Sequence, residues 1–342
     1  MCIRDRFISL GRSPAVVPET LDALLEKNIK IKRTYLITTN DDTIWNDCIP
    51  LIEEDFNAHY KSKNMELDLY SCTLMSDDIY NEKDNLELMR KVAGLFKREK
   101  NNNIYISMAG GRKTMSAAMA LLAQIYNARA ITHVLVPQEI ESYGNIFQLT
   151  KLNKREQQKI LHPKEKRLIF FPVIGISWML DDIINALKGK ELKPNRHEII
   201  YILQENGLID QEKKPTDLGN ILLKLLNDIE KIPEPHYDEV KLRFKQAEDQ
   251  HAPKNYRNFV EQLISRFGMY LKEIIGIKFA NSSETRINNI HSPGTIRCQY
   301  SDGSKALVMD LITTAKTSGE LKMLKEILAP FFKKKPLRAK IM

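Results

Sequence analysis

Short runs of β-branched and aromatic residues alternate with amphipathic stretches through the first half of this 342-residue chain. Strands cross over through helices when such units repeat, and each crossover returns the chain to the same end of the sheet. The alternation therefore predicts a Rossmann-like α/β domain with a parallel sheet, in which ligands bind beyond the carboxyl ends of the strands. The expected strands are Phe7–Leu10, Thr34–Thr39, Met65–Thr73, Ile104–Met108 and Ile131–Val136.

The stretches between these runs carry apolar residues at helical spacing. Residues 150–166 are polar and rich in lysine and are expected to form a surface connection, whereas residues 1–6 fit a strand poorly and are expected to be an artefactual or truncated start outside the fold. Helices are expected at Pro18–Lys27, Asp42–Lys61, Asn81–Arg98 and Thr114–Asn127, with a further strand at Leu168–Val173.

Composition limits the setting of the protein and its partners. A formal charge of +8 is compatible with phosphate-bearing partners, from small nucleotides to RNA or DNA. The four cysteines are far apart and lack CxxC spacing, which disfavours disulfides and a zinc site. No apolar run approaches the roughly 20 residues that span a bilayer. We therefore expect a cytoplasmic protein without a metal or cofactor, whose acidic clusters Glu53–Asp55 and Asp181–Asp182 are solvated helix faces.

The strongest chemical signal is the segment Ser107–Thr114, Ser-Met-Ala-Gly-Gly-Arg-Lys-Thr, which joins a predicted strand to a predicted helix. Its two glycines allow the main chain to approach a ligand closely, and the unpaired N–H groups at a helix start attract anions. Arg112 and Lys113 add positive charge, and Thr114 can cap the helix or bind a phosphate oxygen. The Walker spacing GxxxxGK[ST] is absent, so the segment predicts a phosphate cradle of another type.

A second loop, Gly11–Pro14, has the same setting between a strand and a helix. Loops that follow neighbouring parallel strands lie at one edge of the sheet, so we expect both loops to face one ligand. Ser13 either positions a phosphate or ribose hydroxyl or caps the helix. Thr38 and Thr39 end another predicted strand and are expected at the same edge.

Together the two loops resemble those of a known family. The segments GRSPAVVPETLDAL (residues 11–24) and SMAGGRKTMSAAMALL (residues 107–122) resemble CRISPR-associated Rossmann fold (CARF) proteins, especially the ring-nuclease group. The resemblance covers residues 7–175 and implies a homodimer that binds cyclic oligoadenylate, with tetra-adenylate as the expected ring. It also implies slow cleavage without a metal, in which a ribose 2′-hydroxyl attacks its own phosphate and leaves a 2′,3′-cyclic phosphate.

The motif match implies roles for single residues. Ser13 and Lys113 would be catalytic: Ser13 would position the ribose or phosphate, and Lys113 with Arg112 would stabilise the charged pentavalent phosphorus. Binding and cleavage would use the same loops, so the sequence leaves sensor and ring nuclease open. The residues expected to bind the ligand are Gly11, Arg12, Ser13, Thr38, Thr39, Ser107, Gly110, Gly111, Arg112, Lys113 and Thr114.

Residues 176–232 are expected to form a separate winged-helix-like connector. Helical patterns at Trp178–Leu187, Glu198–Asn206 and Thr216–Leu226 surround a turn, which is typical of helix-turn-helix or winged-helix segments. The last of these helices offers Lys224 as its one basic residue, whereas helices that read DNA usually carry more. We therefore favour a connector, with a ligand-gated, DNA-binding transcription regulator as the alternative function.

Residues 236–342 are expected to form a small α+β effector domain after the linker 232–235. Its expected helices are Asp238–Asp249, Asn255–Ile274 and Ser318–Leu328, and its strand-like runs are Ile277–Phe279, Thr295–Tyr300 and Ala306–Thr313, with a hairpin turn at Ser301–Ser304 and a basic tail at Lys333–Lys340.

Arg286 and His291 have the Arg-x4-His spacing of HEPN ribonucleases, but those domains are all-helical and a β-hairpin follows here. The order of two helices and a twisted sheet is more similar to RelE-type messenger-RNA interferases. This resemblance implies a metal-independent ribonuclease acting on messenger RNA at the ribosome. Arg286 and Arg297 would offset phosphate charge, and His291 would transfer a proton. Tyr300 would stack on a base, and the RNA-binding residues would be Arg286, Arg297, Tyr300 and Lys305.

The favoured function is that of a type III CRISPR protein that responds to cyclic oligoadenylate, degrades it and controls a C-terminal ribonuclease. Besides the transcription regulator, a stand-alone ring nuclease with a structural C-terminal domain is an alternative. In that case Arg297 and Lys305 would be solvated strand residues, and His291 would only shape a turn.

Overall fold

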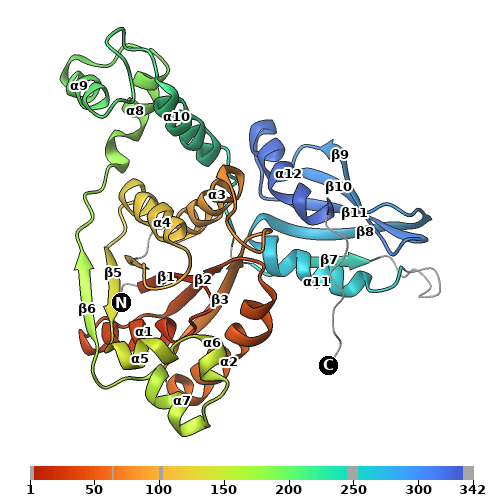
Figure 1. The fold of residues 1–342 in the computed structure, drawn as a ribbon. Coiled ribbons are helices and arrows are strands. Elements are labelled where there is room, and N and C mark those ends of the chain that lie inside the picture. Colours follow the sequence, from red (N-terminus) through yellow and green to blue (C-terminus); the bar gives the residue numbers. More distant parts are fainter. Residues whose placement is uncertain (1–3, 64, 100–102, 237, 245–252, 334–342) are drawn as a thin grey trace. The chain divides into compact units, whose positions relative to one another are not determined.

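The computed structural model describes residues 4–63, 65–99, 103–236, 238–244 and 253–333 (Figure 1). The chain divides into two compact units, Met1–Asn227 and Asp228–Met342, and each is described by itself. Among the described residues, no helix combines the length and apolar character needed to cross a membrane.

A six-stranded sheet forms the centre of the first unit. Five strands run parallel, and β6 pairs antiparallel with β5. The strand order reverses between β1 and β4, which is the type of position where α/β sheets bind ligands. The predicted Rossmann-like parallel sheet is therefore confirmed. In spatial order the strands are β3 (Asp68–Thr73), β2 (Arg33–Thr38), β1 (Arg4–Leu10), β4 (Asn103–Ser107), β5 (Ala130–Leu135) and β6 (Arg167–Phe171).

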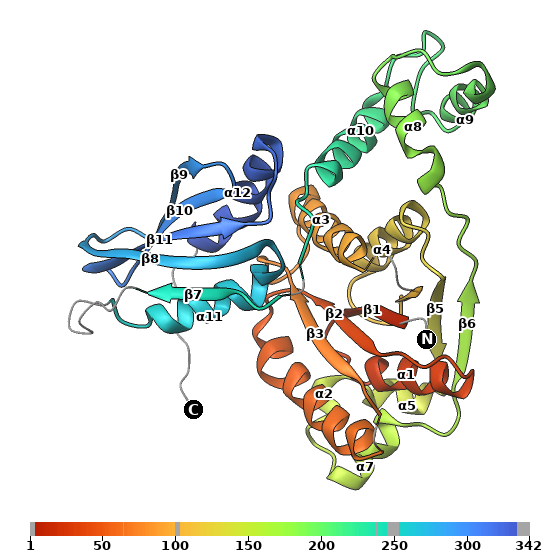
Figure 2. The ribbon, with the colours of Figure 1, turned by 180° about the vertical axis from the view of Figure 1, so that it is seen from behind.

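Helices cover both faces of this sheet (Figures 1 and 2). On α4 the predicted apolar stripe is buried, and Met119 and Leu122 are inaccessible to solvent. Asn81 starts α3 by accepting the N–H groups of Lys83 and Asp84, which would otherwise lack partners. The helices are α1 (Val16–Glu26) and α2 (Ile49–Asp55) on one face and α3 (Glu82–Arg98) and α4 (Lys113–Ile125) on the other.

Several short helices complete the first unit. The region 150–166, expected to be a surface connection, contains a helix whose start is a capping box between Asn153 and Glu156. That Asn-x-x-Glu signature was present in the sequence and was not recognised. The short helices are η1 (Ile44–Cys48), η2 (Phe56–Tyr60), η3 (Lys61–Lys63), α5 (Gln138–Tyr143), α6 (Ile146–Leu149) and α7 (Lys154–Leu161).

The start of the chain corrects one expectation. Strand β1 begins at Arg4, so residues 4–6 belong to the fold; residues 1–3 lie outside the described residues. Arg6 is fully buried and donates from Nη1 to the Val17 carbonyl at 2.7 Å. Asp5 is buried as well and pairs with Arg33 at 2.9 Å. The charged residues Asp5 and Arg6 made this segment look unlike a buried strand. Buried charges are tolerated when they have partners, and those partners cannot be identified from the local sequence.

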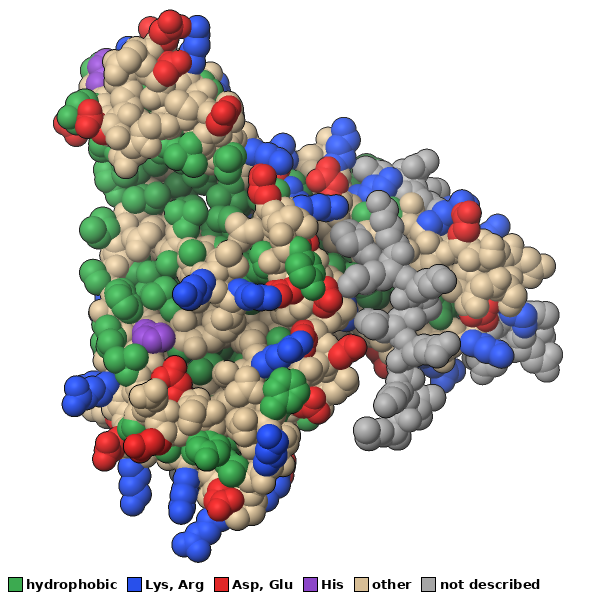
Figure 3. All heavy atoms as spheres, in the orientation of Figure 1, with side chains coloured by type: hydrophobic (Ala, Val, Ile, Leu, Met, Phe, Trp, Pro, Cys, Tyr) green, Lys and Arg blue, Asp and Glu red, His purple; other side chains and the backbone are tan. Residues whose placement is uncertain are grey.

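Exposed apolar side chains gather around β6 and the segment that follows it (Figure 3). Phe170 and Phe171 are about two-fifths exposed, while Ile174 and Trp178 are 79% and 63% exposed. Contiguous apolar surface of this kind commonly marks an interaction site. The helix predicted over Trp178–Leu187 is present, but the side chain of Trp178 is exposed on this surface and is not part of the core.

After β6 come three α-helices, α8 (Leu180–Leu187), α9 (Glu198–Glu205) and α10 (Asp217–Glu230), and two 3-10 helices, η4 (Ser177–Met179) and η5 (Pro194–Arg196). Within residues 180–227, which the structure describes without a gap, β pairing consists of one bridge between Ile209 and Pro215. The predicted helices are thus present, and a winged-helix arrangement is not confirmed.

The second unit is a five-stranded sheet with two helices on one face. Aromatic rings connect the sheet to both helices: the ring centroid of Phe259 lies 4.4 Å from that of Tyr300 and 4.9 Å from that of Phe331. The spatial order is β7 (Lys241–Phe244), β8 (Leu271–Asn281), β11 (Lys305–Thr313), β10 (Thr295–Ser301) and β9 (Arg286–Ser292), and the helices are α11 (Tyr256–Phe267) and α12 (Ser318–Lys333).

Two helix predictions in this unit were wrong. In place of a helix over 238–249, residues 241–244 form β7, which pairs in parallel with β8; residues 245–252 lie outside the described part. The helix expected to reach Ile274 ends at Phe267, because the β-branched run from Leu271 pairs with β11 instead. The hairpin between β10 and β11 is confirmed. Residues 334–340 of the basic tail lie beyond the described residues.

Candidate functional site

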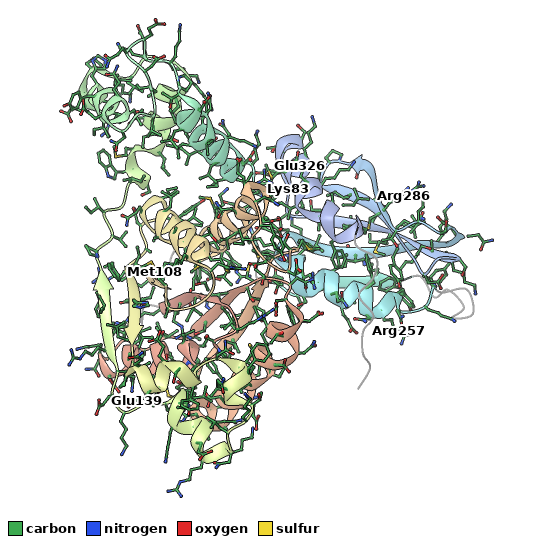
Figure 4. The ribbon with its side chains drawn as sticks, in the orientation of Figure 1. Lys83, Met108, Glu139, Arg257, Arg286 and Glu326 are labelled. Carbon is green, nitrogen blue, oxygen red and sulfur yellow. The ribbon has the colours of Figure 1, made fainter. Side chains whose placement is uncertain are left out.

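A pocket of about 390 Å³ opens at the carboxyl ends of the strands, where the loops after β1 and β4 meet. This is the switch point of the sheet, so the topology itself places the pocket. In Figure 4, Met108 marks the point where the chain leaves β4 for the glycine loop. Polar residues on the pocket wall include Arg12, Ser13, Thr39, Asp41, Asp78, Arg112 and Asn145.

The glycines hold the two loops against each other. A Cβ on Gly11 would lie 3.2 Å from the Gly111 Cα, and one on Gly110 would lie 2.2 Å from the Ser9 carbonyl oxygen. The Ser9 hydroxyl donates to the Gly110 carbonyl, and Gly111 has a φ of +75° that favours glycine. The expectation that both loops lie at one edge of the sheet is confirmed.

Helix α4 begins directly at the pocket. Arg112 occupies the N-cap position without a side-chain capping bond, and Lys113 is the first helical residue. The N–H groups of Lys113 and Thr114 precede the first intrahelical acceptor and remain available, whereas that of Met115 donates to the Arg112 carbonyl at 2.9 Å. The helix dipole adds positive potential at the same place. Thr114 lies two residues beyond the N-cap position, inside the helix, and does not cap it, which corrects that expectation. Lys113 and Thr114 are exposed but do not line the pocket wall.

Both arginines of the pocket are paired with carboxylates. Arg12 Nη2 lies 2.6 Å from Asp41 Oδ2, and Arg112 Nε donates to Asp78 Oδ1 at 2.9 Å while its Nη2 contacts Asp78 Oδ2. The hydrogen bond from Arg112 holds the pKa of Asp78 below its usual value, so this carboxylate is ionised at neutral pH. A phosphate entering the pocket would compete with these carboxylates for the two guanidinium groups.

Three predicted ligand residues are buried away from the pocket wall. Thr38 is inaccessible and donates to the Thr39 carbonyl at 3.3 Å. Ser107 is inaccessible as well, and its hydroxyl lies 3.4 Å from that of Thr20. Each is the last residue of its strand, β2 or β4, and is buried there. Gly110 takes part only by packing on Ser9, whereas Thr39 lines the pocket as expected.

Ser13 lies on the pocket wall and is partly exposed. Helix α1 has Ala15 at its N-cap and no side-chain capping bond. Among the described residues no hydrogen-bond partner holds the Ser13 hydroxyl, which leaves it available to a ligand. The alternative of a helix cap is therefore not supported.

Sequence reasoning missed Asp41, Asp77, Asp78 and Asn145 as pocket residues. The three aspartates follow the carboxyl ends of β2 and β3, so reading the residues after every predicted strand would have found them. Asn145 lies between α5 and α6, two helices that the sequence did not predict.

A separate cluster of titratable groups joins α1, η2 and α7. Asp22, His59 and His162 place ligand-type atoms within 4.8 Å of one another. His162 contacts Asp22 through Nδ1 at 2.8 Å and Asp55 through Nε2 at 2.9 Å. Burial opposes the charged ring, but the two carboxylates outweigh it and raise the pKa of His162 to about 9. An imidazolium has no lone pair for a metal, so this is an ionic core cluster. Asp55 is buried in it and is not the solvated residue that we expected.

In the second unit the candidate RNA residues do not form one open site. Arg286 is the first residue of β9 (Figure 4), is exposed, and pairs with Glu284 at 2.9 Å. Arg297 makes two hydrogen bonds of 2.7 Å to Asp310. Tyr300 is 1% exposed and donates to the Lys254 carbonyl, which contradicts its expected stacking on a base. Lys305 starts β11 and is half-buried; the side chain of His291 lies outside the described part of the chain.

Comparison with known proteins shows which family the first unit resembles. The model of the family described as CRISPR-associated protein NE0113 matches residues 13–205, which is more than half of the chain. The match includes the whole of the loop Ser107–Thr114 and begins within the first loop, at Ser13. The CRISPR system ring nuclease SSO2081 of Saccharolobus solfataricus is 28% identical over 134 residues, covering 38% of this chain and 70% of that protein.

Among solved structures, Enterococcus italicus Csm6 bound to cyclic hexa-2′-fluoro-hexa-dAMP matches with a TM-score of 0.35 and 14% identity, covering 67% of this chain and 55% of that one. The chain thus spans about half the length of that protein. A UDP-GlcNAc 2-epimerase from Neisseria meningitidis matches with a TM-score of 0.28 and 12% identity, covering 80% of this chain and 65% of that one. On the strength of the family match and the two loops, the chain belongs to the CRISPR-associated protein NE0113 family and is a CARF-type CRISPR protein.

Proposed function

We propose that the first unit binds cyclic oligoadenylate in the pocket at the switch point and cleaves it as a ring nuclease. The observation that carries this proposal is the close contact of Gly11 with Gly111. This contact joins the two predicted phosphate-binding loops, Gly11–Pro14 and Ser107–Thr114 (the phosphate-type loops), around one pocket. The related ring nuclease of S. solfataricus supports the same activity. Cyclic tetra-adenylate is the ring that we expect.

Ser13 and Arg112 on the pocket wall, with Lys113 beside it at the start of α4, offer the groups that such a reaction needs. The ligand supplies its own nucleophile: a ribose 2′-oxygen attacks the adjacent phosphorus, loses its proton, and displaces the 5′-oxygen, which takes up a proton. Lys113 and Arg112 would stabilise the extra negative charge on the phosphoryl oxygens, assisted by the amides of Lys113 and Thr114. Ser13, whose hydroxyl is free in the described chain, would orient the ribose or phosphate. The chemistry assigned to these side chains requires no metal.

We further propose that two copies of the chain share the ring. A cyclic ligand with repeating nucleotides suits a two-fold arrangement, in which each copy offers the same loops. The exposed apolar side chains around β6 support self-association. We retain the division into a ligand domain (7–175), a connector (176–232) and an effector domain (236–342) as part of this proposal.

Calorimetric titration of the full chain with cyclic tetra-adenylate and cyclic hexa-adenylate tests the binding step. Linear tetra-adenylate serves as a control of equal composition, and light scattering before and after titration reports the dimer. We expect one ring to bind per two chains, more tightly than the linear form. If neither ring binds, the proposal fails.

A ribonuclease in the second unit is a further proposal with narrower support. Arg286 of β9 lies opposite Gln299 of β10, and Arg297 lies two residues before Gln299 on β10. Because side chains alternate along a strand and Tyr300 faces the helices, these three residues lie on the opposite face of the sheet. Arg286→Ala combined with Arg297→Ala should abolish cleavage of ribosome-bound messenger RNA in the presence of the ring. Cleavage that survives both changes would assign the activity elsewhere.

A further inference from the structure

The segment that joins α5 to α6 forms a wall of the pocket that none of the phosphate-type motifs includes. The N–H of Ile146 donates to the Arg12 carbonyl at 2.8 Å, which ties the start of α6 to the loop after β1. A Cβ on Gly144 would lie 3.3 Å from that of the buried Ala15, so the turn also packs on the start of α1. The side chains that follow are therefore held beside the pocket.

Asn145 presents a defined pair of hydrogen-bonding atoms on this wall. It is the N-cap of α6, and its Oδ1 accepts the N–H of Phe147 at 3.0 Å. Only the oxygen can accept this hydrogen bond, so the orientation of the amide is fixed. Nδ2 has no acceptor among the described residues, and Oδ1 retains a second lone pair. The amide can thus donate one hydrogen bond into the pocket and accept another.

Phe147 adds an exposed aromatic surface at the same place. Phe147 is 51% exposed; it does not itself line the pocket, but the guanidinium carbon of the pocket-lining Arg12 lies 5.9 Å from its ring centroid. An exposed aromatic side chain beside a polar pocket is accessible to a partner, and a partner that covers it removes apolar surface from water. Nucleic-acid bases are such partners, because they stack on aromatic rings and on guanidinium planes.

We propose that Asn145 and Phe147 form an adenine-specific subsite of this pocket, with Phe147 stacking on the base and Asn145 reading its edge. The inference rests on the proposed function and deepens it. An asparagine amide that donates to N7 and accepts from the exocyclic N6 amine fits adenine. Hypoxanthine and guanine carry an oxygen acceptor at position 6 and cannot satisfy Oδ1. The phosphate-type loops would thus hold the backbone of the ring, and α6 would select its base.

The test compares the binding affinities of the full chain for cyclic tetra-adenylate and cyclic tetra-inosinate. The same comparison is made for cyclic hexa-adenylate and cyclic hexa-inosinate. Phe147→Ala should weaken binding of the adenylate ring by about 5- to 150-fold, the range reported for loss of one stacked base. Tyr143→Ala is the matched control, because Tyr143 is an aromatic residue of similar exposure on α5 whose ring, unlike that of Phe147, has no contact with Arg12 among the described residues. It should bind like the wild type.

Asn145→Ser keeps an N-cap side chain but removes the amide. The wild type should prefer the adenylate ring over the inosinate ring by about 5- to 150-fold, and Asn145→Ser should lose that preference. If the wild type binds the rings but Phe147→Ala and Asn145→Ser match it in affinity and selectivity, the subsite is overturned while the proposed function stands. If the wild type binds no ring, both fail. An unchanged melting temperature of each variant verifies that the fold is intact.

Discussion

Gly110→Ala isolates the geometry of the phosphate-type loop from its charge. A Cβ at this position would lie 2.2 Å from the backbone oxygen of Ser9, and contacts shorter than 3.0 Å are essentially never observed, so the loop must move by about 0.8 Å. Ser9 cannot yield, because it is fully buried in β1 between β2 and β4. The displacement therefore falls on the loop that carries Arg112 and Lys113.

A displacement of this size is large for a binding site. Misplacement of reacting groups by about 1 Å can cost about 100-fold, so we expect the affinity for cyclic tetra-adenylate to fall by about 10- to 100-fold. Overpacking should also lower the free energy of unfolding by about 1–3 kcal/mol. Calorimetric titration measures the first quantity and urea unfolding the second.

Gly11→Ala is the control within the same pocket. Its Cβ would lie 3.2 Å from the Gly111 Cα, a contact that a shift of a few tenths of an ångström relieves. We expect less than a threefold change in affinity, by the same reasoning about placement. If Gly110→Ala binds as tightly as the wild type, or Gly11→Ala loses as much affinity, loop closure on β1 is not what positions the ligand.

Two further perturbations address the charges. Asp78→Asn removes the carboxylate that occupies Arg112, so affinity for the ring should rise about two- to fivefold in titrations at low salt, the scale of an exposed ion pair; a fall in affinity would mean that Asp78 itself holds the ligand. The pKa of His162 is about 9 in the folded chain and 6.5 as the ordinary value, so its stabilising charge is fully present below pH 6.5 and is lost as the pH rises through 9. The urea midpoint should therefore fall over this interval, and His162→Gln should flatten that dependence; an equally steep decline in the variant would exclude His162 as its source.

The sheet and the two glycine loops could be predicted because their signals are local. Alternating strands and helices fix the order of crossovers, and a loop such as Gly110–Thr114 is recognisable from consecutive residues. Arg6 could not be recognised as part of β1, because its partner, the Val17 carbonyl, lies in another element. Burial of Thr38 and Ser107 depends on the residue at which each strand leaves the sheet, which periodicity does not define to within one position.

The second unit was harder to predict from the sequence, because its elements also depend on partners that are distant along the chain. Residues 241–244 form a strand only because β8 is available for pairing, and a four-residue segment carries little propensity of its own. Tyr300 has the composition of a base-stacking residue, yet alternation along β10 turns it toward Phe259 and α11. Asn145 and Phe147 escaped notice because α5 and α6 are too short for a helical period to be visible.

The measurement that bears most directly on the proposed function is mass spectrometry of the products formed from cyclic tetra-adenylate in the presence of a chelator. We expect linear products that end in a 2′,3′-cyclic phosphate and a 5′-hydroxyl. Lys113→Ala should form them about 100-fold more slowly, as expected for loss of one group that stabilises the transition state. Lys154→Ala, which removes an exposed lysine of α7 paired with Glu54, should leave the rate unchanged. An intact ring after incubation with the wild type, or cleavage by Lys113→Ala at the wild-type rate, would contradict the mechanism proposed for this pocket.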